Sequence, residues 1–291
     1  MKTFKKIIDS GALWGGLYEP SQRKNNEGKG LRAVVFGSTN AGALVVDSLK
    51  RFEEKYPHLL NLVGVATDDP VDPNARISAQ KRIWKHFKKE EMILLLDKVI
   101  KTASDGGLPC YTGSVKTDYF RNILKEWNPE IIIMCCFGQK IDAAIFNYPR
   151  YGMYNYHPSD LAAKIGLGLD PFGDAIKTGS KTSMMTVHQV TETIDYGPII
   201  GNSPPVNICT TNGDYPKNIL TLHEKIPSVC GWLSIELILE AIKIKQSGKE
   251  GTISSIDFNE KMPSMIREQL LEAATDDLTA SYSLPLHDKI I

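Results

Sequence analysis

The sequence predicts an α/β fold in which a Rossmann-like, mostly parallel sheet carries helices on both faces. Three apolar runs of strand length, Arg32–Gly37, Leu60–Thr67 and Glu130–Phe137, alternate with segments of helical periodicity. Unbroken apolar runs are typical of parallel strands that are buried on both faces. Strands that alternate with helices favour right-handed crossovers within one sheet, and ligands of such sheets bind beyond the carboxyl ends of the strands.

The first predicted strand, Arg32–Gly37, leads into a turn of small residues and then into an amphipathic helix that runs to about Glu54. Leu60–Thr67 is the second strand, and a cluster of Asp and Pro residues at Asp68–Asn74 ends it. The charged, helical pattern of residues 76–105 predicts a helix with a solvated face that covers the sheet.

The middle of the chain holds the clearest strand. Pro109–Tyr111 is a short candidate strand, and Asp118–Trp127 is a predicted helix that ends before Pro129. Glu130–Phe137 follows as an apolar run that we expect to be a buried central strand.

The second half continues the alternation. Met153–His157 and Ser183–Val190 are predicted strands, Ile199–Ile208 is a further extended segment, and Ile219–Lys245 is a long predicted helix. We expect three parts: an N-terminal extension at residues 1–30, which is polar and Gly-rich towards its end, a catalytic domain at 31–245 and a C-terminal tail at 246–291.

Composition limits the classes of function. Of the 291 residues 42% are hydrophobic and 23% charged, and the net charge is zero, so a general nucleic-acid or membrane-surface binder is not expected. The five cysteines show no C-x-x-C spacing, which argues against a zinc site. No long apolar stretch follows the first lysines, so we expect neither a signal peptide nor a membrane span. We expect a cytoplasmic location. Composition is compatible with a homo-oligomer.

The stretch Tyr151–Ser159, which reads Y-G-M-Y-N-Y-H-P-S, carries the strongest chemical signal. In a strand, Asn155 and His157 point to the same face, and Pro158 ends the strand because it cannot donate to a ladder. Asn can stabilise a developing oxyanion, His can move a proton, and a carboxylate such as Asp195 can orient and charge the imidazole. One Asn-x-His pair alone is usually accidental, so its neighbours decide the interpretation.

Those neighbours are G-Q-K-I at Gly138–Ile141, a glycine at Gly166, and T-I-D-Y-G-P-I-I around Asp195. In this order and spacing the chain resembles the formyltransferases that use N10-formyltetrahydrofolate, over roughly residues 32–241 and most strongly over 136–200. The resemblance implies a catalytic centre of Asn155, His157 and Asp195. It also implies N10-formyltetrahydrofolate as formyl donor and a small-molecule amine as acceptor.

The resemblance also implies two binding segments. The pterin of the donor would lie between them, where backbone groups would read its hydrogen-bonding edge. The implied donor-binding residues are Phe137, Gly138, Gln139, Lys140, Ile141, Thr191, Glu192, Thr193 and Ile194. The implied substrate-binding residues, in the turn after the first strand, are Gly37, Ser38, Thr39 and Asn40; there free N–H groups at a helix N-terminus suit an anion, and a tight turn that needs small residues is an equal alternative.

Departures from the family pattern lie in one loop. Relatives commonly read S-L-L-P with an Arg-Gly soon after, whereas Asp160–Asp170 does not, so we expect an unusual acceptor pocket. Ser159 is expected to hold this turn. His188, a lone strand histidine, is expected to be structural, and His58, His86, His223 and His287 are expected at the surface or as caps.

Several functions remain open. The turn after the first strand lacks the G-x-G-x-x-G spacing of dinucleotide-binding folds, which disfavours NAD. The leading acceptor is a nucleotide-linked amino sugar. Methionyl-tRNA ranks low because the chain is neutral and the tail is short. A formyltetrahydrofolate hydrolase, with water as acceptor, and a non-catalytic nucleotide-binding α/β protein also fit the sequence.

Overall fold

The computed structural model describes residues 3–9, 14–20, 30–69, 98–164, 166, 170–218, 220–277, 282 and 284. Within them a nine-stranded sheet has the order β1-β2-β5-β4-β3-β6-β7-β9-β10. Its strands are β1 (Thr3–Asp9), β2 (Trp14–Glu19), β3 (Leu31–Gly37), β4 (Leu60–Thr67), β5 (Cys110–Gly113), β6 (Ile131–Cys135), β7 (Met153–His157), β9 (Thr186–Gln189) and β10 (Ile199–Asn202). A second, two-stranded sheet pairs β8 (Thr182–Ser183) with β11 (Val206–Asn207).

The centre of the large sheet is parallel and both of its edges are antiparallel. Strands β5, β4, β3, β6 and β7 run parallel to one another. At the edges, β1, β2 and β5 form antiparallel pairs, as do β7, β9 and β10. The predicted α/β fold with a mostly parallel central sheet is confirmed.

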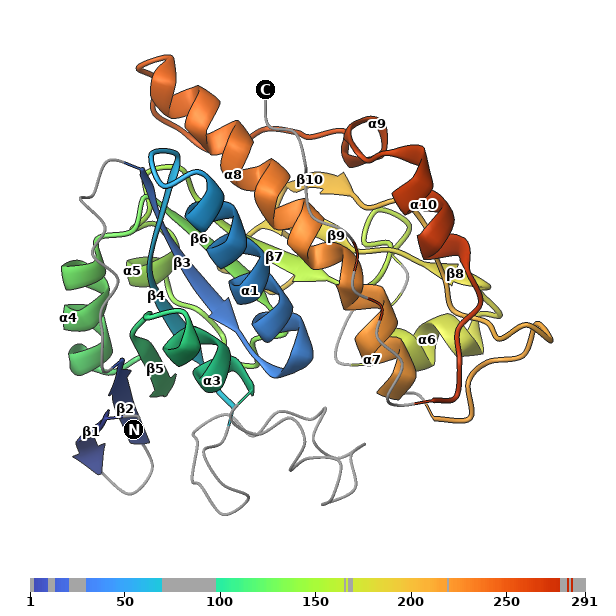
Figure 1. Ribbon diagram of the computed structural model, residues 1–291, viewed down its shortest axis with the longest axis horizontal. Helices are drawn as coiled ribbons and strands as arrows, with labels where there is room; N and C mark the ends of the chain where they lie inside the picture. Colours follow the sequence, from blue (N-terminus) through green and yellow to red (C-terminus); the bar gives the residue numbers. More distant parts are fainter. Residues whose placement is uncertain are drawn as a thin grey trace.

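Helices cover both faces of this sheet (Figure 1). The helical segments are α1 (Thr39–Lys55), α3 (Lys98–Asp105), α4 (Asp118–Trp127), α5 (Ala143–Phe146), α6 (Pro171–Lys177), α7 (Leu220–Lys225), the 3₁₀ turn η2 (Ile226–Val229), α8 (Cys230–Gln246), α9 (Phe258–Lys261) and α10 (Ser264–Leu271). The predicted helix at 76–105 is described only from Lys98 onward, and the rest of it lies outside the described residues.

Alternation along β3 divides the core into two clusters. Leu31, Ala33 and Val35 pack into the cluster under α1, α3 and α8, whereas Val34 and Phe36 face the cluster under α4 and α5. Every residue of β3 from Ala33 to Gly37 is buried, so both faces of this strand are covered, as in a parallel strand between two layers of helices.

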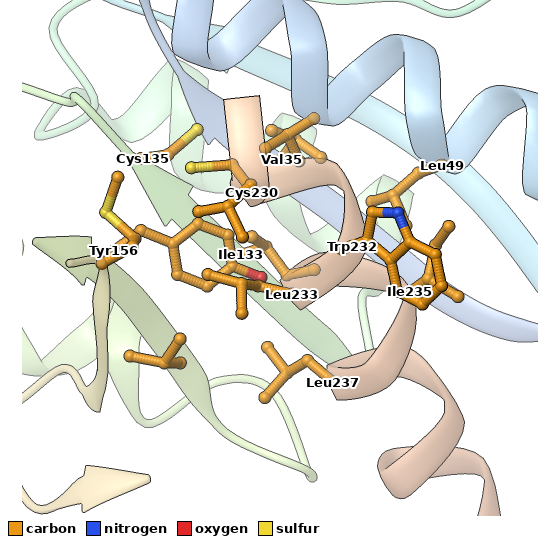
Figure 2. Close-up of a cluster of buried hydrophobic side chains, with 14 of the residues drawn as sticks. Val35, Leu49, Ile133, Cys135, Tyr156, Cys230, Trp232, Leu233, Ile235 and Leu237 are labelled. Atoms are coloured by element: carbon orange, nitrogen blue, oxygen red, sulfur yellow. The ribbon is translucent and has the colours of Figure 1, made fainter. Parts of the chain in front are cut away.

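Helix α8 forms the wall of the first cluster (Figure 2). Its residues Cys230, Leu233 and Leu237 pack against the sheet side chains Cys135 and Tyr156. The Tyr156 hydroxyl shares a hydrogen bond of 3.0 Å with Ser234 Oγ, so the phenol is satisfied within an otherwise apolar layer. This layer covers β6 and β7 on the face away from Asn155 and His157.

Two segments expected outside the core belong to it. Strand β2, in the expected N-terminal extension, pairs with β5, and Leu17 is buried in the cluster under α4. In the expected tail, Phe258, Ile266 and Leu270 are buried in the cluster under α8. The extension and the tail therefore complete the sheet edge and the core, and the domain boundaries at residues 30 and 245 stay a prediction.

Candidate active site

A cavity of about 450 Å³ opens at the carboxyl ends of the central parallel strands. Thr39 follows β3, Cys136 follows β6 and His157 ends β7, and all three line the cavity. The chain leaves β3 for β4 on one side of the sheet and later adds β6 on the other, so the cavity lies at the topological switch point. A volume of this size fits a small organic ligand.

Local sequence explains why Asn155 and His157 reach this cavity together. Both belong to the same face of β7, and their relative exposures are 9% and 7%. Residues Tyr154 and Tyr156 point to the opposite face, into the cluster under α8. Pro158 follows at the cavity wall and ends the strand, as predicted.

Asp195 is the centre of a cluster of polar side chains. Its Oδ2 lies 3.7 Å from His157 Nδ1, and its Oδ1 lies 3.6 Å from His188 Nε2. The Nδ2 group of Asn155 lies 3.1 Å from His188 Nε2 and 3.5 Å from Asp195 Oδ1. The structure therefore brings the three predicted catalytic residues together and adds a second histidine.

Hydrogen-bond partners define the proton positions on the two imidazoles. The carbonyl of Gly166 lies 2.8 Å from His157 Nε2, and because a carbonyl only accepts, Nε2 carries a proton. Nδ1 of His157 is then the nitrogen that faces Asp195. In the same way, Nδ1 of His188 donates to the Gln189 carbonyl at 3.1 Å, and Nε2 faces Asn155 and Asp195.

The carboxylate of Asp195 is held in its ionised form. Burial by itself raises the pKa of Asp195, but the hydrogen bond with His188 and the charges of His157 and His188 outweigh it, and the pKa lies below its usual range. Asp195 therefore places a negative charge 3.7 Å from Nδ1 of His157. The pair can therefore hold a proton taken from a nearby amine and release it again.

Most of the predicted donor-binding residues line the cavity. They are Phe137, Gly138, Gln139, Lys140, Ile141, Thr191, Thr193 and Ile194. Glu192 is exposed and is not part of the described lining. Gln139 has a bracing role: its Oε1 accepts from Val115 N at 3.1 Å and its Nε2 donates to the Gly113 carbonyl at 2.7 Å. These bonds hold the loop after β5 against the cavity wall.

The turn predicted to contact substrate is largely bonded to the protein itself. Of Gly37–Asn40, Thr39 lines the cavity, together with Ala41 of α1. Gly42 packs closely on Gly37, and a Cβ added to Gly42 would lie 2.5 Å from the Gly37 carbonyl carbon. The turn therefore needs small residues. Ser38 and Asn40 bond to side chains of other elements, and the substrate contacts of this turn stay a prediction.

Two histidines that the sequence does not assign to the site line the cavity. His188, predicted to be structural, contacts Asn155 and Asp195. His223, predicted at the surface or as a cap, lines the cavity, and its ring meets that of Phe172 edge-on at 4.2 Å. His188 reaches this position because it pairs with Asn155 in the antiparallel ladder of β7 and β9. The spacing of residues in the sequence does not reveal such a register.

Other expectations fall partly outside the described residues. His58 is exposed, as predicted, and His86 and His287 are not described. Cys135 is buried, whereas Cys136 is half-buried on the cavity wall. Among the described residues no helix is long and apolar enough to cross a membrane, and no cluster of His, Cys, Asp and Glu is arranged to hold a metal ion.

Known proteins share this sequence pattern and this fold. A family model described as formyl transferase matches residues 31–227. A methionyl-tRNA formyltransferase from Ehrlichia chaffeensis is 30% identical over 152 residues, which cover 50% of this chain and 47% of that protein. The one from Syntrophomonas wolfei is 37% identical over 89 residues, covering 31% and 28%. The chain thus spans less than half the length of these curated relatives.

Solved structures share the fold at low identity. A phosphoribosylglycinamide formyltransferase from Coxiella burnetii has a TM-score of 0.53 at 17% identity, covering 79% of this chain and 99% of that chain. A formyltetrahydrofolate deformylase from Pseudomonas syringae pv. tomato has a TM-score of 0.52 at 16% identity, covering 73% and 62%. Since the matched family model covers more than half of the 291 residues, this chain belongs to the formyl transferase family.

Proposed function

We propose that the protein transfers a formyl group from N10-formyltetrahydrofolate to a primary amine. The observation that carries the proposal is the convergence of Asn155, His157 and His188 on Asp195 at the wall of the cavity. Membership of the formyl transferase family supports it. An amide donor, an imidazole and a fixed carboxylate are the groups that acyl transfer to an amine needs.

The reaction exchanges one C–N bond for another. The acceptor nitrogen attacks the formyl carbon, the bond from that carbon to N10 breaks, and the proton of the amine ends on N10. Asn155 Nδ2 donates a hydrogen bond that stabilises the negative charge on the formyl oxygen, in place of its long 3.5 Å contact with Asp195 Oδ1. His157 takes up and returns the proton at Nδ1, and Asp195 stabilises its charged form. Because the two substrates react directly, proximity supplies much of the acceleration.

The cavity wall suits the formyl donor. Phe137, Ile141 and Ile194 offer apolar surface for the flat pterin. The exposed side chain of Lys140 borders the same wall and can pair with a carboxylate of the donor's glutamate. Main-chain groups of the segments 137–141 and 191–195 supply donors and acceptors for the pterin edge.

Two amine acceptors compete. The relatives named methionyl-tRNA formyltransferase favour methionyl-tRNA over the nucleotide-linked amino sugar that the sequence alone ranks first. The cavity lining also includes the apolar residues Phe172, Met185 and Cys230, which can contact an apolar side chain such as that of methionine. The zero net charge of the chain argues the other way, because tRNA binding depends on basic surface. We propose methionyl-tRNA as the acceptor to test first.

Donor binding is testable without knowing the acceptor. We expect 5-formyltetrahydrofolate, a stable analogue of the donor, to raise the melting temperature of the purified chain in a concentration-dependent way, because a ligand that binds only the folded state stabilises it. Folic acid without the formyl group serves as a comparison ligand. No shift at millimolar analogue would count against the proposal. Release of formate without any amine would instead identify a formyltetrahydrofolate hydrolase.

A further inference from the structure

Two carboxylates of the protein, Asp68 and Asp69, lie at the start of α1, and Asp69 bonds to its first amide. Thr39 N donates to Asp69 Oδ2 at 2.6 Å, and Gly138 N donates to Asp68 Oδ2 at 2.7 Å. Asp68 and Asp69 come directly after β4, and each has a relative exposure of 1%. Two backbone donors at this end of the sheet are therefore already used, and by anions.

The side chains of the same turn are used as well. Ser38 Oγ donates to Asp68 Oδ1 at 2.5 Å and does not cap α1. Asn40 is bonded at both ends of its amide, since its Oδ1 accepts from Lys98 and its Nδ2 donates to Glu224. The polar groups of Ser38 and Asn40 thus hold together the ends of β3 and β4 and the helices α3 and α7.

The positive end of the α1 dipole is also compensated. A helix N-terminus attracts an anion through its free N–H groups and its partial positive charge, and Asp69 takes the position where a phosphate would bind. Of the described residues that line the cavity, Lys140 is the one Lys or Arg, whereas Asp170 and Asp195 are carboxylates. A phosphate brought to Thr39 would meet like charges and no free donor from that amide.

We infer that Asp68 and Asp69 are specificity-determining residues, which exclude a phosphate from this end of the cavity and restrict the acceptor to amines that present a neutral or cationic group there. The inference rests on the proposed function, because it assumes that the amine acceptor binds at the part of the cavity wall that contains Thr39. It separates this chain from enzymes whose amine acceptor carries a phosphate close to the reacting nitrogen. The turn is a rigid, internally bonded wall of the acceptor pocket.

The experiment measures phosphate binding directly at the turn. Inorganic phosphate and ribose 5-phosphate are titrated into the folded protein at matched ionic strength, with ribose as the comparison ligand that lacks a phosphate. The amide NMR signals of Thr39 and Gly138 are followed. Asp69→Ala frees the Thr39 amide and removes a charge, whereas Asp69→Asn removes the charge and keeps an acceptor. Asp118→Ala is the matched control, because Asp118 lies in the first turn of α4 and is exposed.

We expect no saturable phosphate response at Thr39 in the wild type or in Asp118→Ala. Asp69→Ala should bind phosphate at least about tenfold more tightly than the wild type, with Asp69→Asn in between. Saturation of the wild-type Thr39 signal at submillimolar phosphate would overturn the inference, as would a folded Asp69→Ala protein that gains nothing. If Asp69→Ala does not fold, Asp69→Asn decides: tighter phosphate binding than in the wild type supports the inference, and unchanged binding overturns it. Since the titration uses neither folate nor amine, a chain without formyl transfer can still pass it.

Discussion

Asp195 adopts a backbone conformation that few residues with a side chain tolerate, with a φ of 58°. The turn directs its carboxylate between His157 and His188, 3.7 Å and 3.6 Å from their nearest nitrogens. Its neighbours Ile194 and Tyr196 are 60% and 70% exposed, so the turn projects from the surface while its acid points inward. Left-handed geometry at a site of this kind is a strain that the surrounding contacts must hold.

The lowered pKa of Asp195 makes a prediction about acid stability. Because the folded protein keeps this carboxylate ionised at a pH where the unfolded chain binds a proton, the group stabilises the fold above its unfolded pKa, near 3.8, and loses that contribution as the pH falls through the folded value. We expect Asp195→Asn to lose less stability than the wild type between about pH 5 and pH 3 in urea unfolding. A steeper acid loss in the variant would contradict the assigned direction.

Gly166 positions His157 through its carbonyl and has no room for a side chain. Its φ is +63°, and an added Cβ would lie 2.9 Å from Ser159 Cβ and 3.2 Å from Pro171 Cα. We expect Gly166→Ala to lower formyl transfer at least about tenfold, because a shift of a catalytic group costs rate steeply. The measurement is kcat/KM with the fold checked by circular dichroism.

Gly179 offers the matched control for that substitution. Its φ is +72° and an added Cβ meets nothing within 4 Å, so Gly179→Ala carries the same backbone penalty of about 1 kcal/mol without a contact to the site. Equal activity losses in the two variants would show that backbone strain alone, and not the bond to His157, is responsible.

At the scale of elements, the segment after α8 is part of the core. Helix α10 packs against β11 and buries Ile266 and Leu270 in the cluster that α8 also lines, and Lys225 of α7 donates to the carbonyl of Glu272, just after α10. Burial lowers the pKa of Lys225 to about 8, because desolvation outweighs the attraction of Glu272. The last part of the chain thus contacts the helix that carries His223, on the wall of the cavity.

Ile266 tests how much this segment contributes. It is 1% exposed, and we expect Ile266→Ala to lower the free energy of unfolding by about 2–5 kcal/mol, the usual cost of removing a large buried side chain. Met265→Ala is the control, since Met265 is the neighbouring residue and is 61% exposed. Denaturant unfolding of both variants gives the two values. A loss below about 0.5 kcal/mol for Ile266→Ala would mean that α10 is not held on the core.

The elements also show what the sequence could predict. Strands β3, β4 and β6 are mostly apolar runs, and a parallel strand buried on both faces leaves that pattern whatever its partners are. Strand β2 escapes prediction because it holds Gly15 and Gly16, which are poor strand formers. A Cβ on Gly15 would lie 2.0 Å from the Tyr111 hydroxyl, so the close approach of β5 demands glycine there.

The site could be predicted in part for the same kind of reason. Asn155 and His157 share one strand, where alternation alone places them on one face. Asp195 is predicted from the resemblance to the formyltransferases, in which an Asp before a Gly follows that strand. His188 and His223 reach the cavity only through strand register and helix packing, which depend on contacts between distant segments and leave no local spacing in the sequence.

At the scale of the whole molecule, the cavity belongs to no single element. It gathers residues from the ends of β3, β6 and β7, the loop 191–195, α6, α7 and the start of α8. The switch in strand order beside β3 creates the crevice, and the α8 layer shown in Figure 2 contributes Cys230 to its wall. We propose that this cavity as a whole carries out formyl transfer, with His157 and Asp195 moving the proton.

Formyl transfer itself is the most direct measurement of that proposal. With N10-formyltetrahydrofolate as donor and methionyl-tRNA or nucleotide-linked amino sugars as acceptors, we predict tetrahydrofolate release that requires an amine. His157→Ala, Asn155→Ala and Asp195→Ala should each lower kcat/KM by about 10²–10⁴-fold, whereas the exposed-histidine control His58→Ala should match the wild type. Near-normal turnover in all three folded variants would contradict the proposed roles of these residues.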